Sequence, residues 1–165
     1  MPDTIVKLNT GLNASSTLIG NGAFDPRWEL ESAPGTVITG SAKAYVHHSS
    51  YTHFDPEPDA LWIFPPTTPY FGGNWPNGNY TYKISFDLDR TLYDNYRMDY
   101  QYTGPAWRNS SSTTNDSLFV NGTNTLKVVV NNYSPSLSPM GLTLKGSVTA
   151  DWTSFKTSRI RLKHL

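Results

Sequence analysis

The stretch PYFGGNWPNGN, residues 69–79, holds the side chains with the clearest potential for binding chemistry. An aromatic ring can stack on the C–H-rich face of a sugar, and amide groups can hydrogen-bond the hydroxyls on its rim. Glycines and prolines within the stretch turn and stiffen the backbone, so less conformational entropy is lost when a ligand binds. We therefore predict a ligand site centred here, made by Tyr70, Phe71, Asn74, Trp75 and Asn77.

A tryptophan in this sequence can be interpreted either as a ligand-binding residue or as a structural residue that packs in the core or anchors a loop. Trp107, in the Ser/Thr/Asn-rich connection PAWRNSSSTTNDS over residues 105–117, is the next candidate for the ligand site, and the alternative is that it pins its loop to the domain. For Trp75 the alternative is a place in the core. Trp28, Trp62 and Trp152 fall on apolar strand faces or in an apolar run, and we predict that they are core residues.

Residues suited to catalysis form no convincing constellation. Asp55, Glu57 and Asp59 in FDPEPD could supply a carboxylate pair, but glycoside hydrolysis needs the pair about 5–10 Å apart in a cleft. His47 and His48 are adjacent in a predicted strand and therefore point to opposite faces, whereas zinc needs converging ligands. Neither a nucleophile elbow nor a phosphate-binding loop before a helix is visible. We predict that the protein is not an enzyme.

Composition excludes several classes of partner. The 165 residues include 13 basic and 13 acidic side chains, so no bulk charge favours nucleic acid. No apolar run approaches the roughly 20 residues of a membrane span, and the beginning MPDTIVKLNTG has no signal-peptide pattern. There is no cysteine, which excludes disulfides and thiolate metal sites. We expect neither a nucleic-acid partner nor a membrane span.

Alternating apolar and polar residues, separated by turn formers, recur along the chain and indicate strands wet on one face. LFVNGTNTLKVVVNN (118–132) is one example, and GNYTYKISFDLD (78–89) is the clearest. The apolar positions of these alternating segments predict a core that includes Trp28, Tyr82, Ile84, Phe86, Leu126, Val128, Val130, Leu142, Leu144 and Val148. No helical periodicity appears. The pattern predicts an all-β fold of two antiparallel sheets packed as a β-sandwich, with one domain over residues 1–152 and a basic C-terminal strand or tail over residues 153–165.

The order WIFPP, GNYTYKISFDL, LFVNGTNTLKVVVNN, GLTLKGSVTA, preceded by the opening LNTGLNASSTLIGNGAFDPRWEL, resembles bacterial extracellular domains with the galactose-binding-like jelly-roll fold. One departure is that the segment around residues 88–96 is too short for a strand that such domains usually have. The resemblance implies an extracellular or cell-surface location, with the signal peptide not present in this chain. It also implies a structural calcium ion at Asn21 and Asp25, for which capping of the Asp-Pro turn by Asp25 is the alternative. We expect no other cofactor.

Such domains usually bind carbohydrate without changing it, so the resemblance implies a carbohydrate-binding, lectin-like recognition module whose partner is a glycan or another surface ligand. The alternative is a structural subunit of a surface layer, filament or phage appendage that self-associates through exposed strands and aromatic side chains. A long unpaired terminal strand would favour assembly, and an aromatic cluster in a concave loop region would favour binding.

Overall fold

The structure is a computed structural model that describes residues 2–20, 22–34, 42–47, 59–65, 77–104, 107–132 and 141–153. Its strands form two antiparallel sheets, one in the order β1-β9-β6-β7 and the other in the order β4-β3-β2-β5-β8. Among these residues there is no α-helix, and one short 3-10 helix, η1 (Asp116–Leu118), precedes β8. The strands are β1 (Asp3–Lys7), β2 (Phe24–Ser32), β3 (Ala42–His47), β4 (Trp62–Phe64), β5 (Gly78–Leu88), β6 (Tyr93–Gly104), β7 (Trp107–Thr113), β8 (Gly122–Asn132) and β9 (Thr143–Trp152).

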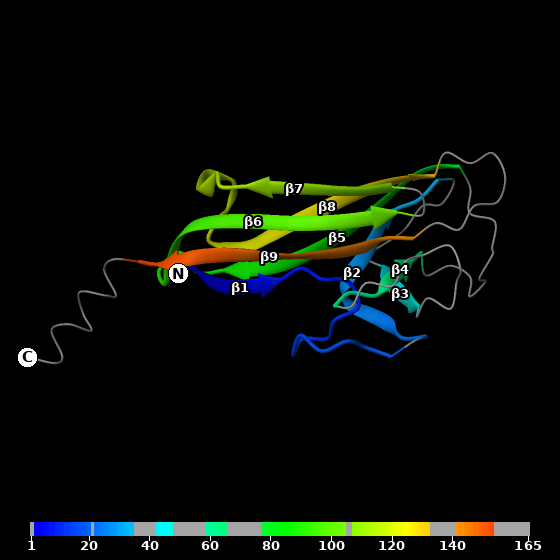
Figure 1. Ribbon diagram of the computed structural model, residues 1–165, viewed down its shortest axis with the longest axis horizontal. Helices are drawn as coiled ribbons and strands as arrows, with labels where there is room; N and C mark the ends of the chain where they lie inside the picture. Colours follow the sequence, from blue (N-terminus) through cyan, green and yellow to red (C-terminus); the bar gives the residue numbers. More distant parts are fainter. Residues whose placement is uncertain are drawn as a thin grey trace, which may run out of the picture.

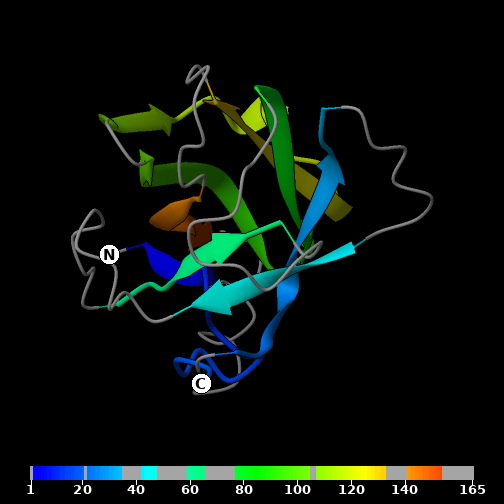
Figure 2. The same ribbon diagram turned by 90° about the vertical axis from the view of Figure 1, so that its right-hand side faces the viewer.

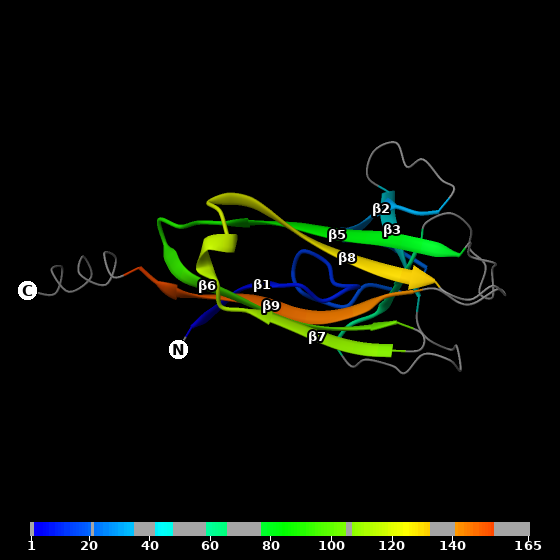
Figure 3. The ribbon, with the colours of Figure 1, turned by 90° about the horizontal axis from the view of Figure 1, so that it is seen from above.

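The two sheets form two layers around one hydrophobic core, which confirms the all-β sandwich. Figure 3 shows β5 and β8 in one layer and β6, β7 and β9 in the other. Inward-facing residues of both layers are buried, because alternation places every second side chain of a strand on the same face. The predicted core residues Trp28, Trp62, Tyr82, Ile84, Leu126, Val128, Val130, Leu142, Leu144 and Val148 are all buried.

Three expectations about side chains and strands need correction. Trp152 was predicted to be a core residue because it has the core-facing parity of β9, but it is the last residue of that strand and is 47% exposed. The ring of Tyr93 packs on it, with 4.6 Å between the ring centroids. Phe86 packs against the core but is only partly buried. Part of the connection 105–117 is a strand, β7, which pairs with β6 through its backbone although its sequence shows no apolar alternation.

Figure 1 shows that β1 and the strands from β5 to β9 run along the length of the molecule, so the ends of these strands gather at two opposite ends. At one end β5 begins beside the end of β8, where Gly78 pairs with Asn132. Also there β6 ends beside the start of β7, where Gly104 pairs with Trp107. At the other end β1 begins beside the end of β9, and Asp3 pairs with Ala150.

One side of the sandwich is closed by hydrogen bonds between the two sheets. Ile63 of β4 exchanges backbone hydrogen bonds of 2.9 and 3.0 Å with Leu142, just before β9, and Leu61 N donates to Thr10 O at 3.0 Å. The Thr10 hydroxyl donates to Leu61 O at 2.6 Å and accepts from Leu144 N at 3.1 Å. Figure 2, which faces the end where β3 and β4 lie, shows β4 beside β3. We call this row of contacts (Thr10, Leu61, Ile63, Leu142 and Leu144) the seam.

The opposite side of the sandwich is open by comparison. There the edge strands are β7 in one sheet and β8 in the other, and the strand pairings of the described chain join each to one neighbour only. An edge strand leaves backbone N–H and C=O groups for solvent or for another chain. The two sides of the sandwich therefore differ in how firmly they are held together.

Two adjacent valines test which face of β8 is inside. Val128 is 5% exposed and Val129 is 55% exposed. We expect Val128→Ala to lower the free energy of unfolding by about 1.5–3 kcal/mol, from lost burial and a residual cavity. Val129→Ala, the matched control, should cost less than about 0.5–1 kcal/mol because its side chain already meets water. Urea unfolding measures both, and equal losses would contradict the assigned faces.

Candidate functional site

The ligand site predicted from the sequence falls largely outside the residues that the structure describes. Tyr70, Phe71, Asn74 and Trp75 lie there, as does Asn21 of the predicted calcium site. Asn77 is exposed and immediately precedes β5. Trp107 is the first residue of β7, and its side chain is not among those described. Asn77 and Trp107 thus lie at the same end of the sandwich but in different sheets.

Asp25, the other residue of the predicted calcium site, is fully buried and accepts three backbone hydrogen bonds. Its Oδ1 accepts from Arg27 N at 2.8 Å and Trp28 N at 3.0 Å, which closes the turn at the start of β2. Its Oδ2 accepts from Gly11 N at 2.6 Å, fourteen residues away in sequence. Asp25 therefore both caps its own turn, as the alternative interpretation predicted, and holds the segment that follows β1.

Arg27 and Trp28 hold the same segment through its carbonyl groups. Arg27 donates from its two terminal nitrogens to Lys7 O and Asn9 O, both at 2.7 Å, and Trp28 Nε1 donates to Leu8 O at 3.0 Å. We call Asp25, Arg27 and Trp28 together with these backbone partners the clamp. Figure 1 shows the segment after β1 passing across β2, as the clamp requires.

Gly11 is required where the clamp turns the chain. Its φ is +76°, in the left-handed region that favours glycine. A Cβ atom at this position would lie 2.5 Å from Leu61 Cβ, so the backbone also passes too close to the seam for any side chain. Glycine can adopt this positive φ and has no side chain to collide with Leu61. The N–H of Gly11 can therefore reach the Asp25 carboxylate.

Burial raises the pKa of Asp25, although the three N–H donors and the Arg27 guanidinium oppose the shift. A carboxylate has about four lone pairs, so three N–H bonds leave little capacity for a metal ion. Calcium binding at Asn21 and Asp25 stays a prediction. In the described part of the chain, no three residues among His, Cys, Asp and Glu come together as a metal cluster.

A first hollow lies beside the clamp, on the outer face of the β1-β9-β6-β7 sheet. Its volume is about 410 Å³, and Asn9 on its floor donates to Asp59 O at 2.8 Å and accepts from Gly146 N at 3.1 Å. Leu18, which is 41% exposed, forms an apolar part of the wall. We call it the clamp-side hollow, and it is lined by Thr4, Lys7, Asn9, Leu12, Ser16, Leu18, Asp59, Lys145, Gly146 and Ser147.

A second hollow of about 450 Å³ continues across the same sheet towards β7. The pairings of Asp99 with Ser112 and Ser147, and of Gln101 with Ser110 and Lys145, place these side chains on the same face. We call it the β7-side hollow, and it is lined by Asp99, Tyr100, Gln101, Ser110, Ser111, Ser112, Lys145, Gly146 and Ser147.

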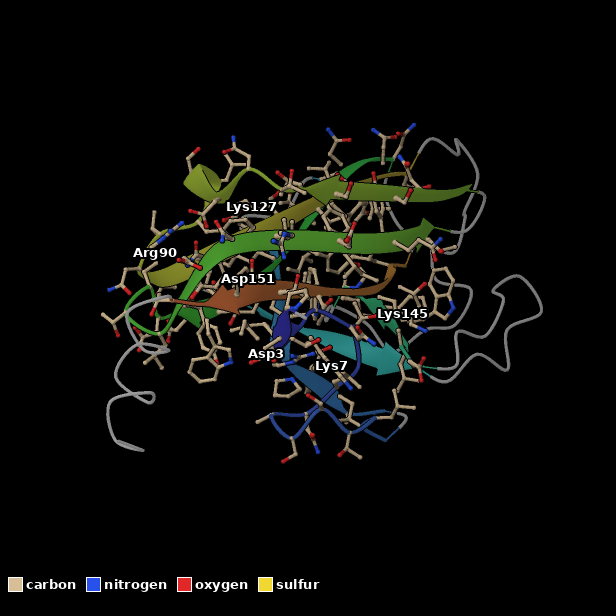
Figure 4. The ribbon with its side chains drawn as sticks, turned by 60° about the vertical axis from the view of Figure 1, so that its left-hand side comes forward. Asp3, Lys7, Arg90, Lys127, Lys145 and Asp151 are labelled. Atoms are coloured by element: carbon tan, nitrogen blue, oxygen red, sulfur yellow. The ribbon has the colours of Figure 1, made fainter. Side chains whose placement is uncertain are left out.

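The two hollows share Lys145, Gly146 and Ser147 of β9, so we treat them as one trough. Lys145 Nζ lies 2.6 Å from Asp59 Oδ2. This hydrogen bond lowers the pKa of Asp59, with a smaller contribution from Lys7. Figure 4 shows Lys7 and Lys145 on β1 and β9, on the side of the sheet where the trough lies. A side chain at 146 would overlap the backbone oxygen of Asp99, so glycine allows β9 to lie close to β6 at the join.

The trough offers hydroxyl, amide, ammonium and carboxylate groups on a regular sheet face. Such groups can hydrogen-bond a hydroxyl-rich molecule without any covalent step. None of the predicted ligand-binding residues lies in the trough. The alternation in GLTLKGSVTADW indicates that Lys145, Ser147 and Thr149 face outward. Which strands lie beside β9 depends on the order of strands in the sheet, so the residues of the trough could not be grouped from the sequence.

Comparison with known proteins adds no family to this geometry: no family model, no curated protein and no solved structure matches the chain. No helix among the described residues is long and apolar enough to cross a membrane.

The clamp is tested by Asp25→Asn. The amide keeps one acceptor oxygen but presents N–H donors to backbone N–H groups, so buried donors lose their partner. We expect the free energy of unfolding to fall by about 1–3 kcal/mol. Asp3→Asn is the matched control, because Asp3 is exposed at the start of β1, and it should change stability by less than about 0.5 kcal/mol. Unchanged stability in Asp25→Asn would contradict the clamp.

Calcium binding has a separate test. If Asn21 and Asp25 hold calcium, adding calcium to metal-free protein should raise its melting temperature in proportion to the logarithm of calcium concentration, since a ligand of the folded state stabilises it. Magnesium at equal ionic strength is the control. A melting temperature that is the same with calcium and with EDTA would remove the prediction.

Proposed function

We propose that the protein is a non-catalytic recognition module that binds carbohydrate in the trough. The observation that supports the proposal most is the pair of adjoining hollows, lined by hydroxyl and amide side chains, on one ordered sheet face. Side chains fixed on strands lose little entropy when a ligand binds. A sugar presents many hydroxyls that both donate and accept, which is the chemistry that Gln101, Ser110 and Ser147 can meet.

The proposed class is the galactose-binding-like jelly roll at the cell surface or outside the cell. The sheet orders support it, because the chain crosses between sheets after β1, β5, β7 and β8, while β5 pairs with β8 and β6 pairs with β9. Crossovers of this kind make the Greek-key connections from which jelly rolls are built.

Weak binding follows from the composition of the trough. Hydrogen bonds exchanged with water contribute little each, and Leu18 is the exposed apolar side chain in the wall. We expect dissociation constants between micromolar and millimolar for this reason. The end-of-sandwich site predicted at Tyr70, Phe71, Asn74, Trp75, Asn77 and Trp107 stays a competing location for the same function.

The non-catalytic assignment is supported by the state of Asp59. This carboxylate lies in the clamp-side hollow, and its hydrogen bond to Lys145 lowers its pKa. A general acid of glycoside hydrolysis needs a raised pKa. Asp55 and Glu57 lie outside the described residues. Incubation with oligosaccharides should therefore release no new reducing ends.

The alternative function, assembly into a larger structure, has one observation of its own. Val129 is exposed on β8, the eleven-residue edge strand on the open side of the sandwich. An edge of this kind can add to a neighbouring sheet. The unpaired terminal strand that would favour assembly is predicted for residues 153–165, which lie outside the described residues after Thr153. Within the described chain, β1 and β9 are paired with each other. Light scattering after size-exclusion chromatography separates the two functions, because assembly requires a mass above that of one chain.

A glycan array tests the proposed site with the variants Ser147→Arg, Ser85→Arg and Trp75→Ala. Ser147→Arg places a long side chain where the two hollows join and should reduce binding at least tenfold. Ser85→Arg is the matched control, because Ser85 is exposed on β5 in the other sheet, and it should leave binding unchanged. Circular dichroism and melting temperature confirm that each variant folds.

Trp75→Ala distinguishes the trough from the predicted loop site. Binding that survives this change but is lost in Ser147→Arg supports the trough. Binding that is lost in Trp75→Ala and kept in Ser147→Arg would move the site to the end of the sandwich. An array on which the wild-type protein binds nothing, at concentrations up to millimolar, would contradict carbohydrate recognition.

A further inference from the structure

We infer that the trough takes several consecutive residues of a neutral, linear oligosaccharide, lying across the strands, and does not recognise only a single sugar. This inference rests on the proposed function and specifies its ligand. It follows from the direction of the trough, from its length and from its charge balance.

The direction comes from the strand order. The strand residues that line the clamp-side hollow come from β1 and β9, and those of the β7-side hollow come from β9, β6 and β7. These strands are neighbours in this order in the sheet. The cross-strand partners Lys7, Ser147, Asp99 and Ser112 form one row across all four strands. A ligand that contacts both hollows must follow this row, across the strands.

The length comes from the spacing of strands. Neighbouring strands lie about 4.8 Å apart, so four strands cover roughly 15 Å. A single sugar ring is shorter than this row, so a ligand that contacts both hollows has several linked sugar residues. Both ends of the row belong to edge strands, β1 and β7, and the pairings of the described chain add no further strand beyond them. A longer chain can therefore extend past the trough at the β7 end, whereas at the β1 end the segment with Leu12, Ser16 and Leu18 lines the clamp-side hollow.

The charge balance favours a neutral chain. The charged side chains that line the two hollows are Lys7, Lys145, Asp59 and Asp99, two of each sign. Lys145 is already paired with Asp59 at 2.6 Å. A polyanion would place repeated charges beside Asp59 and Asp99, and like charges at short range are unfavourable. Neutral hydroxyls avoid this cost and can still bind all four charged groups.

Isothermal titration calorimetry with a series of defined chain lengths tests this inference. The probes are β-1,4-linked oligosaccharides of xylose, glucose and mannose from one to six residues long, with oligogalacturonides of equal length as anionic probes. We expect affinity for at least one neutral series to rise at least tenfold between two and four residues and then to change less than about twofold. The anionic series should bind more weakly, and 0.5 M NaCl should leave neutral binding unchanged.

Two variants test which part of the trough produces the rise in affinity with oligosaccharide length. Ser112→Arg, at the exposed β7 end of the row, should reduce the affinity for four residues to that for two or below. Ser85→Arg on the opposite sheet should keep the full dependence on length. A gain that persists unchanged in Ser112→Arg would overturn the crossing geometry.

The outcomes separate this inference from the proposed function. A monosaccharide that binds as tightly as four residues would overturn the extended site while the recognition function stands. Tighter binding of the anionic series would overturn the neutral ligand in the same way. If no probe of any length binds, the proposed function falls and this inference falls with it.

Discussion

The carboxylate of Asp25 is the group on which the rest of the structure depends. It is fully buried and would be costly there without partners, yet three backbone N–H groups from two distant segments bind it. Arg27 and Trp28, next in the chain, fix the same segment through its carbonyls. The path after β1 is therefore determined by β2 side chains acting on backbone groups. From that path follow the place of β1 beside β9, the seam at Thr10 and the floor of the clamp-side hollow at Asn9.

The proposed binding surface lies next to the closed side of the sandwich for a physical reason. At the seam the backbone groups of Leu61, Ile63 and Leu142 are paired across the two sheets, so the local structure has few alternatives. Asp59 lies just before that seam and reaches Lys145, which brings a carboxylate onto a sheet face otherwise made by strands β1, β9, β6 and β7. The open side, with edges β7 and β8, has no comparable cross-sheet pairing among the described strands. The side closed by the seam is the one that suits the proposed recognition. The exposed edge strands of the other side are the feature that assembly would use.

Much of the fold was predictable because alternation is a local signal. Trp28, Ile84 and Leu126 were predictable as inside because their neighbours in sequence are polar, and no knowledge of the partner sheet is needed. Trp152 has the same parity but extends past the end of the core, a property of the whole sandwich and not of β9. β7 forms through its backbone pairing with β6 and has no apolar pattern to reveal it. The trough depends on which strands are neighbours, so its residues, unlike the aromatic loop at 69–79, could not be grouped from the sequence.

The pairing of β1 with β9 determines how the domain responds to mechanical load. Asp3 and Ala150 are partners in adjacent antiparallel strands, so a force that pulls the two strand ends apart acts along their hydrogen bonds, which run from strand to strand. Such a force breaks the ladder one bond at a time, from Ala150 towards Gly146, at low tension. Peeling must then reach Leu8 and Thr10, where the clamp holds the same segment from β2 and the seam holds it from Leu61. The resistance of the domain to pulling is therefore concentrated at the clamp. Strand β1 detaches and extends before the clamp carries the load.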